Sequence, residues 1–457
     1  MTDDLRDKRT FSRGVHPPES KHVTEDRPIE PGPAVGELSI LLSQHIGAPC
    51  QAAVKKGDLV EAGQKIGECQ AFVCAPVHAP VPGKVRDLAL KPHPVLGRCQ
   101  AIAIEARDPA RPSLPSFDLP ADFDPARYKP DEICEAVRDA GLVGMGGAGF
   151  PTSVKIQPDA KPPKHTLLVN GCECEPYITC DYRVMLEWTD QVLAGIRLAQ
   201  RACGASKVFI GIEDNKPKAI EAMTTAIARA GSAGDIRVVP LQTKYPQGGE
   251  RQLINAVLGQ TVPTGGIPPM IGVVVINVAT AAAIADAVLY NRPLTHRVVT
   301  VTGEAIARPG NYYVSIGTPI EALIEFCGGV TEKSAKVVMG GPMMGLAIAD
   351  LRTPITKTGG AVTVLTRHQI GQAKFERRQT ACIRCGRCLE VCPENLNPTR
   401  IAHAVKSNLL DVAESDFISA CIECGCCSYV CPANIELTGY IKTGKIFLAR
   451  QRKKMPA

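Results

Sequence analysis

Hydrophobic residues in the middle of the chain recur with two different periods, and the alternation predicts strands followed by helices. Residues 165–170, HTLLVN, form an apolar run that ends in a polar residue, which is typical of a buried strand. Residues 271–290, IGVVVINVATAAAIADAVLY, indicate a strand, a turn and a helix. Further upstream, Ile133, Val137 and Leu142 follow a helical pattern. The central part of the chain is therefore predicted to be α/β.

The flanking segments have other patterns. Residues 55–67 and 75–85 are short valine-rich strands separated by glycine turns, which predicts a small barrel or sandwich. The residues that follow position 107 are rich in proline and polar side chains, and they indicate a linker. Residues 296–329 predict two strands, a turn and a helix. The patterns thus predict several modules rather than one repeated unit.

Length, composition and charge narrow the class of protein. A chain of 457 residues exceeds what one hydrophobic core serves, so three or more domains are expected. A net charge of +6 and an aromatic share of 4% argue against a nucleic-acid partner. The most apolar segment, 271–290, contains Asn277, Thr280 and Asp286, and no segment reaches the roughly 20 apolar residues that cross a bilayer. The first residues lack the apolar core of a signal peptide, so a cytoplasmic protein is expected.

Nineteen cysteines in such a chain point to metal binding rather than disulfides, because the cytosol keeps thiols reduced. Eight of them form two runs with two, two and three intervening residues, and each run ends in proline. The second run repeats the first after 39 residues. The runs are Cys382, Cys385, Cys388 and Cys392 before Pro393, and Cys421, Cys424, Cys427 and Cys431 before Pro432. This spacing is typical of ferredoxins with two 4Fe–4S clusters.

In such proteins the fourth cysteine of each run ligates the partner cluster. The predicted ligand sets are Cys382, Cys385, Cys388 and Cys431 for one cluster, and Cys421, Cys424, Cys427 and Cys392 for the other. Zinc knuckles are the alternative, but zinc sites seldom use a doubled run of this spacing. Cys426 breaks the repeat and is expected to be a thiol without a ligand role. Two close clusters without catalytic residues of their own are expected to relay single electrons.

A glycine-rich loop precedes the buried strand of residues 165–170. Its glycines are Gly141, Gly144, Gly146, Gly147 and Gly149. Such loops are often only tight turns, but bare amides followed by Lys155 offer a phosphate site. Glu173, Glu175 and Asp181 follow the strand, at the edge where α/β sheets bind ligands. Cys172, Cys174 and Cys180 lie among these acids, and free thiols are favoured there over a third metal site.

Four motifs in this region resemble, in the same order, the flavoprotein subunit of respiratory complex I, which binds FMN and oxidises NADH. They are GMGGAGFPTSVK, VNGCECEP, YPQGGERQL and VINVAT. The resemblance implies that the flavin phosphate and ribityl chain are surrounded by Gly144, Gly146, Gly147, Ala148 and Gly149, with Lys155 on the phosphate. It also implies that Asn170 and Asn277 hold the isoalloxazine. The residues implied to face NADH are Glu175, Glu250 and Phe150. Two positions depart from that family, because Met145 replaces an arginine and Cys172 replaces an aspartate.

The whole chain resembles the C-subunit family of Rnf (Rsx) electron transport complexes, with GVHPPE and LSQHIGAP near the N-terminus. The implied fold is multidomain α/β and α+β, with a barrel-sandwich hybrid like that of biotinyl and lipoyl carriers, an α/β FMN- and NADH-binding domain, a soluble-ligand-binding β-grasp domain and a ferredoxin-like domain for two 4Fe–4S clusters. The expected segments are an N-terminal arm 1–30, the barrel 31–108, a linker 109–131, the FMN/NADH domain 132–295, the β-grasp domain 296–350, a connector 351–378, the cluster domain 379–445 and a basic tail 446–457.

This resemblance implies a peripheral subunit on the cytoplasmic face of the bacterial inner membrane, with NADH as substrate and the other Rnf subunits as partners, above all a cluster-carrying one. Hydride would pass from NADH to FMN, and electrons would leave singly through the clusters toward ferredoxin or flavodoxin, or in reverse. One alternative is a cobalamin reductase of a bacterial microcompartment, which shares several modules. Another is a relay or scaffold subunit without flavin. The direction of electron flow and the ion that is moved stay open.

Overall fold

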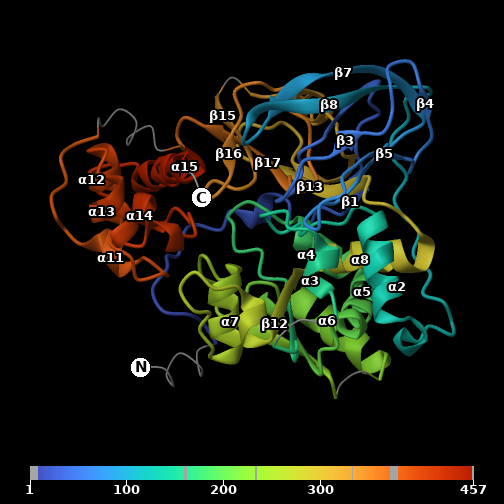
Figure 1. The fold of residues 1–457 in the computed structure, drawn as a ribbon, viewed down its shortest axis with the longest axis horizontal. Helices are drawn as coiled ribbons and strands as arrows, with labels where there is room; N and C mark the ends of the chain where they lie inside the picture. The colour runs from blue at the N-terminus through green and yellow to red at the C-terminus, as the bar shows by residue number, and fades with distance from the viewer. Residues whose placement is uncertain (1–8, 159–161, 232–233, 332, 371–378, 455–457) are drawn as a thin grey trace.

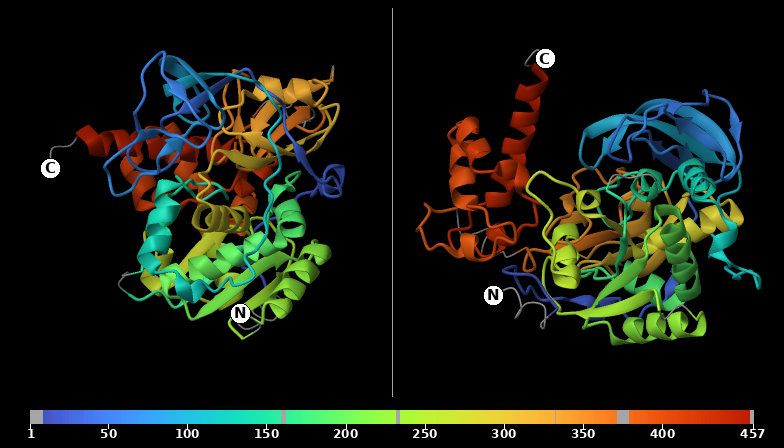
Figure 2. Two further views of the ribbon diagram at one scale, coloured as in Figure 1. Left: turned by 90° about the vertical axis from the view of Figure 1, so that its right-hand side faces the viewer. Right: turned by 60° about the horizontal axis from the view of Figure 1, so that its bottom comes forward.

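The computed structural model describes residues 9–158, 162–231, 234–331, 333–370 and 379–454, and it divides into four modules (Figures 1 and 2). The blue N-terminal module in Figure 1 packs two antiparallel sheets face to face, with strand orders β2-β8-β7-β4 and β3-β5-β6. Buried Ile66, Ile102 and Ile104 fill the space between them. The strands are β2 (Glu37–Leu41), β3 (Gln51–Ala52), β4 (Leu59–Val60), β5 (Lys65–Glu68), β6 (Val77–His78), β7 (Gly83–His93) and β8 (Gly97–Ala106). The predicted barrel or sandwich is confirmed.

The second module is a parallel sheet with the strand order β11-β10-β9-β12 and helices packed against it. Its strands are β9 (Thr166–Asn170), β10 (Lys207–Glu213), β11 (Ile236–Leu241) and β12 (Val273–Asn277). Its helices are α2 (Pro130–Asp139), α3 (Thr152–Ile156), α4 (Cys180–Glu187), α5 (Thr189–Cys203), α6 (Pro217–Arg229), α7 (Glu250–Leu258) and α8 (Val278–Tyr290). The strands read as continuous apolar runs because both faces of a parallel sheet are covered. The predicted α/β domain is confirmed.

The third module is a mixed sheet with the strand order β1-β14-β13-β17-β15-β16 and helix α9 (Ile320–Phe326). The strands are β1 (Ile29–Pro31), β13 (His296–Thr302), β14 (Gly310–Ser315), β15 (Ser334–Met339), β16 (Leu346–Ala347) and β17 (Ala361–Thr366). Strand β1 comes from the N-terminal arm and pairs in parallel with β14. Strand β17 lies between β13 and β15 and is buried at every position. The segment expected to be a connector, 351–378, therefore contains an inner strand of this sheet, whereas residues 371–378 lie outside the described part.

The fourth module is helical and carries both cysteine runs (red in Figure 1). Its helices are α11 (Arg387–Glu390), α12 (Pro398–Lys406), α13 (Leu410–Ser415), α14 (Cys426–Tyr429) and α15 (Leu437–Lys454). The 39-residue repeat recurs in the backbone, because α11 and α12 begin 39 residues before α14 and α15, and Gly386 and Gly425 share a left-handed conformation with φ of 79° and 82°. Helix α15 continues to Lys454, so the segment expected as a basic tail is helical over most of its length. None of the described helices has the length and apolar character needed to span a membrane.

Candidate functional site

The glycine-rich loop lies beside the carboxyl ends of β9 and β12. The parallel register places Asn170 directly opposite Asn277 at this edge of the sheet. The loop is closed by a hydrogen bond from the Gly144 amide to the Phe150 carbonyl, 2.9 Å, and its central part, 146–148, is exposed. A Cβ atom added at Gly146 would lie 3.2 Å from the Asn277 side chain, so a side chain there would press on the strand end. The loop thus offers bare, exposed backbone beside two asparagines.

Lys155 reaches the same strand edge from α3. Its ammonium donates to Glu250 Oε1 at 2.9 Å and to the Val275 carbonyl at 3.1 Å, and both side chains of the ion pair are partly exposed. Glu250 is the first residue of α7, so Lys155 also stands near the positive end of that helix. Exposed amides together with a cation suit a phosphate group, so the residues fit the phosphate of FMN.

The acidic residues have partners within the protein. Glu175 accepts hydrogen bonds from the amides of Met343 and Met344, at 3.2 and 2.7 Å, and burial raises the pKa of its carboxyl to about 7. Asn277 Nδ2 donates to Asp181 at 2.6 Å, and burial followed by the nearby charge of Glu173 raises the Asp181 pKa to about 7. Phe150 is half-buried. Glu175 therefore links this strand edge to the segment between β15 and β16 in the mixed-sheet module. The sequence analysis did not predict this contact.

The three cysteines near this edge have separate surroundings. Cys172 is buried and its thiol lies 3.7 Å from the Gly211 carbonyl. Cys174 accepts a hydrogen bond from the Gly248 amide at 3.3 Å. Cys180 lies beside Glu173 and Asp181 instead. Among the described residues, the three thiols do not gather into one group of possible metal ligands, and their role stays a prediction.

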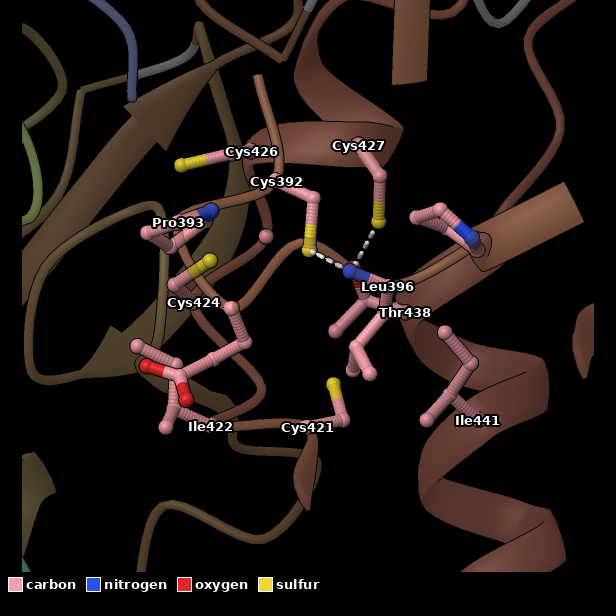
Figure 3. A pocket seen from close by; sticks show the side chains of 13 residues that line it. Cys392, Pro393, Leu396, Cys421, Ile422, Cys424, Cys426, Cys427, Thr438 and Ile441 are labelled. Atoms are coloured by element: carbon pink, nitrogen blue, oxygen red, sulfur yellow. Dashed lines mark hydrogen bonds between the residues drawn. The ribbon is translucent and has the colours of Figure 1, made fainter. Parts of the chain in front are cut away.

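In the helical module, four thiols of one predicted cluster line a single cavity (Figure 3). The thiols are those of Cys392, Cys421, Cys424 and Cys427. Burial raises the pKa of Cys421 to about 12 and that of Cys427 to about 11, so these thiols stay neutral unless a metal displaces their protons. An apolar cavity lined by four sulfurs suits a 4Fe–4S cluster. Cys426 is also buried at the edge of the cavity, and its sulfur points away from Cys392 and Cys427.

The four cysteines predicted to bind the other cluster do not all lie in one buried group. Cys382, Cys388 and Cys431 belong to one apolar cluster of the module, whereas Cys385 is exposed. The Cys388 thiol lies 2.9 Å from the Thr399 hydroxyl, and the same contact recurs 39 residues later between Cys427 and Thr438 at 3.4 Å. The two halves of the module thus share local geometry but differ in exposure.

A junction joins the α/β module to the buried half of the helical module. The Tyr245 hydroxyl donates to the Cys424 carbonyl at 2.8 Å, and Gln252 Nε2 donates to Glu394 at 2.6 Å. The N-terminal arm lies in the same junction, because the Gly14 amide donates to the Val391 carbonyl at 3.1 Å and Val15 pairs with Tyr245. The sequence alone did not predict a role for these residues, because each contact joins positions that lie far apart in the chain.

Lys21 is a further residue of the arm that sequence reasoning missed. Its buried ammonium donates to the carbonyls of Glu173, Glu175 and Ile178 at 2.8, 2.9 and 2.7 Å. These bonds hold the segment that follows β9 in place. Burial lowers the Lys21 pKa, and the charge of Lys216 lowers it further.

Replacing Lys21 with methionine is expected to destabilise this edge, because three carbonyls lose their donor at a cost of about 2–4 kcal/mol. Thermal unfolding of the purified chain should begin at a lower temperature, while Lys218→Met, which removes only an exposed ion pair with Asp26, should leave it unchanged. Equal unfolding temperatures for Lys21→Met and the unmodified chain would show that other contacts hold the segment.

Comparisons with known proteins agree with this architecture. Four families match consecutive parts of the chain. They are the RnfC barrel sandwich hybrid domain over residues 9–108, the Nuo51 FMN-binding domain over 137–286, the SLBB domain over 298–347 and the 4Fe-4S dicluster domain over 378–435. The modules and cysteine runs together define an iron–sulfur flavoprotein of the electron-transfer class.

Relatives along nearly the whole chain specify the family. The chain is 43% identical to the C subunit of the proton-translocating ferredoxin:NAD(+) oxidoreductase complex of Clostridium ljungdahlii, over 90% of this chain and 87% of that one. It is 42% identical to the C subunit of the Na(+)-translocating complex of Acetobacterium woodii, over 89% and 90% of the two chains. The C subunit of the ion-translocating oxidoreductase complex of Rhodobacter capsulatus is 41% identical, over 88% and 76%. The chain belongs to the C-subunit family of ion-translocating Rnf complexes.

The comparison with solved structures shows similarity of fold only. An NAD+-reducing [NiFe]-hydrogenase in the air-oxidized state matches with a TM-score of 0.52 and 22% identity, over 71% of this chain and 62% of that one. The fold over about 71% of the chain is therefore shared with a protein of quite different sequence.

Proposed function

We propose that the chain is the NADH-binding subunit of a membrane-bound, ion-translocating complex that moves electrons between NADH and ferredoxin or flavodoxin. Family membership supports this, since the relatives from Clostridium ljungdahlii and Acetobacterium woodii are named as parts of ferredoxin:NAD(+) oxidoreductase complexes. Bound FMN supplies the exchange between a two-electron hydride donor and single electrons, and 4Fe–4S clusters carry electrons one at a time.

The observation that carries the proposal is the position of residues 245–250. The Gly248 carbonyl accepts a hydrogen bond from Asn170 at 2.8 Å, its amide donates to Cys174, and Glu250 pairs with Lys155. Tyr245 lies at the other end of the same short segment, and its hydroxyl donates a hydrogen bond to the Cys424 carbonyl. One short segment therefore contacts both the candidate flavin site and the cavity lined by cysteines, so the two sites lie near each other, as electron transfer between them requires.

In this proposal each group of residues has a distinct task. The glycine-rich loop 144–149, exposed at 146–148, and Lys155 bind the flavin phosphate, and Asn170 and Asn277 position the isoalloxazine. Phe150, Glu175 and Glu250 orient NADH. The eight cysteines of the two runs hold the two clusters in the crossed sets given by their spacing.

The two cluster sites have different places in the electron path. The set of Cys392, Cys421, Cys424 and Cys427 adjoins the α/β module, so it is the one that exchanges electrons with the flavin. The other set contains exposed Cys385 beside Ile383, whose side chain is 66% exposed. An exposed cluster ligand lets another redox protein approach the cluster closely. We assign this side to a cluster-carrying subunit of the complex on the cytoplasmic face of the membrane.

Anaerobic reconstitution with iron, sulfide and FMN, followed by titration with NADH, tests the proposal. Flavin absorbance should bleach, and EPR signals of two interacting reduced 4Fe–4S clusters should appear. Clusters that form but never respond to NADH, in protein that has bound FMN, would show that electrons arrive from another subunit instead.

A further inference from the structure

A second gathering of sulfur and imidazole ligands lies in the barrel module, away from both cysteine runs. The ligand atoms of His45, Cys50 and Cys74 all lie within 4.8 Å of one another. The Cys50 and Cys74 sulfurs are 4.0 Å apart, and Cys69 joins Cys74 through a disulfide. Cys69 and Cys74 flank the turn that connects β5 and β6. Three ligand side chains from three short segments therefore converge, and Cys69 adjoins them through its bond to Cys74.

His45 has no partner that explains its position. Both ring nitrogens are shielded from solvent, and neither has a hydrogen-bond partner among the described residues. Ring nitrogens that are shielded from solvent and lack hydrogen-bond partners are costly unless something else binds them.

The charge balance around the group also suits a metal with thiolate ligands. Lys357 is fully buried and donates to the carbonyls of Pro76 and Gly141, both at 2.6 Å. None of the ion pairs found among the described residues includes it. Burial lowers the Lys357 pKa to about 7, and a negative charge on Cys50 acts in the opposite direction and favours the ammonium form. A divalent cation with three thiolates and a neutral imidazole carries one net negative charge, which offsets a buried ammonium.

We propose that His45, Cys50, Cys69 and Cys74 form a structural zinc site when Cys69 and Cys74 are reduced. Three thiolates and one imidazole are a common structural zinc set, with ligand atoms about 3.5–4 Å apart around a tetrahedral ion. A dithiol reductant gives two electrons and two protons to the disulfide and is itself oxidised to a disulfide. Zn²⁺ then binds the four ligands and releases the protons of the three thiols. The disulfide and the zinc site are alternative states of the same sulfurs.

The site adjoins the glycine-rich loop. The Ile46 amide donates to the Gly149 carbonyl at 3.1 Å, and the Lys357 amide donates to Gln44 Oε1 at 3.0 Å. Zinc bound at His45 would tie these contacts to the β5–β6 turn. The zinc site therefore holds the barrel against the candidate flavin site, and it goes beyond the proposed electron path.

The test uses the full chain, purified anaerobically with its iron–sulfur clusters, treated with dithiothreitol and then zinc, and desalted. We expect one zinc per chain by elemental analysis, and zinc X-ray absorption should show three sulfurs at about 2.3 Å and one nitrogen at about 2.0 Å. Cys50→Ser and Cys69→Ser should each lower the zinc content several-fold, with iron content unchanged. Cys69 is only half-buried, so its replacement leaves the core of the module intact.

Cys99→Ser is the matched control, because Cys99 lies on β8 of the same module and its thiol lies 3.4 Å from the Gln100 carbonyl, outside the group. Its zinc content should equal that of the unmodified chain. The inference is overturned if the reduced chain holds no zinc, if both serine variants keep it, or if the zinc has four sulfur neighbours, which would place it among the cluster cysteines.

Discussion

Replacing both Cys421 and Cys427 with alanine should abolish NADH-driven reduction of the remaining cluster while leaving reduction of the flavin by NADH intact. These thiols line the cavity that adjoins the α/β module, where Tyr245 bonds the backbone of Cys424. Without them, the cluster next to the flavin cannot form, and the remaining ligand set lies on the exposed side of the helical module. Iron content should fall by half, absorbance should show flavin bleaching, and EPR should show no reduced cluster during the titration.

Cys426→Ala provides the matched control. Cys426 is adjacent to Cys427 and is also buried in the junction, but its sulfur points away from Cys392 and Cys427. This variant should keep its iron and show both cluster signals after NADH is added. If the double variant instead reduces its remaining cluster as fast as the unmodified chain, electrons reach the exposed set by another route, and the order assigned to the two sites is wrong.

Replacing Lys155 with methionine should weaken FMN binding by about 30- to 150-fold, because a charge-assisted hydrogen bond to phosphate contributes about 2–3 kcal/mol. In the structure the Lys155 ammonium is partly exposed and lies near the first turn of α7, where a phosphate would also meet free backbone amides. The dissociation constant can be measured by quenching of flavin fluorescence during titration of the apoprotein.

Lys207→Met serves as the control for Lys155→Met, since Lys207 is an exposed lysine at the start of β10 in the same sheet. It changes the net charge equally, but it should leave the FMN dissociation constant unchanged. Equal weakening by both substitutions would mean that Lys155 acts through general charge. No weakening by Lys155→Met would show that the ammonium serves Glu250 rather than the flavin phosphate.

Much of the architecture was predictable because it rests on local patterns. Continuous apolar runs identified β9 and β12, whose shared edge carries Asn170 and Asn277, and glycine turns identified the barrel. Local patterns did not predict the role of the segment 351–378, which was expected to be a connector but contains the inner strand β17. Strand β17 has an apolar pattern of its own, but it pairs with β13, which lies some sixty residues earlier, and with β15. Sequence spacing carries no record of such a pairing.

Some residues of the candidate sites could also be predicted from local sequence, whereas others were revealed only by contacts between distant positions. The glycine loop and Lys155 were found from neighbouring residues, whereas Lys21 reaches the segment after β9 from about 150 positions away. This lysine has no local feature that distinguishes it from an exposed one, since only burial and three backbone carbonyls give it a role. The group of His45, Cys50, Cys69 and Cys74 was missed for a similar reason, because its spacing matches no familiar run.

The sequence by itself determined the class of protein, its modules and two equivalent cysteine runs, because ligand spacing and strand periodicity are properties of short segments. It could not distinguish the two runs, which obey one spacing and share one backbone conformation 39 residues apart. Only the tertiary structure decided that the cavity with Cys421 and Cys424 lies against Tyr245, while Cys385 stays exposed. The physical reason is that packing against the α/β module and the N-terminal arm buries one half of the repeat, and that packing depends on contacts between distant parts of the chain.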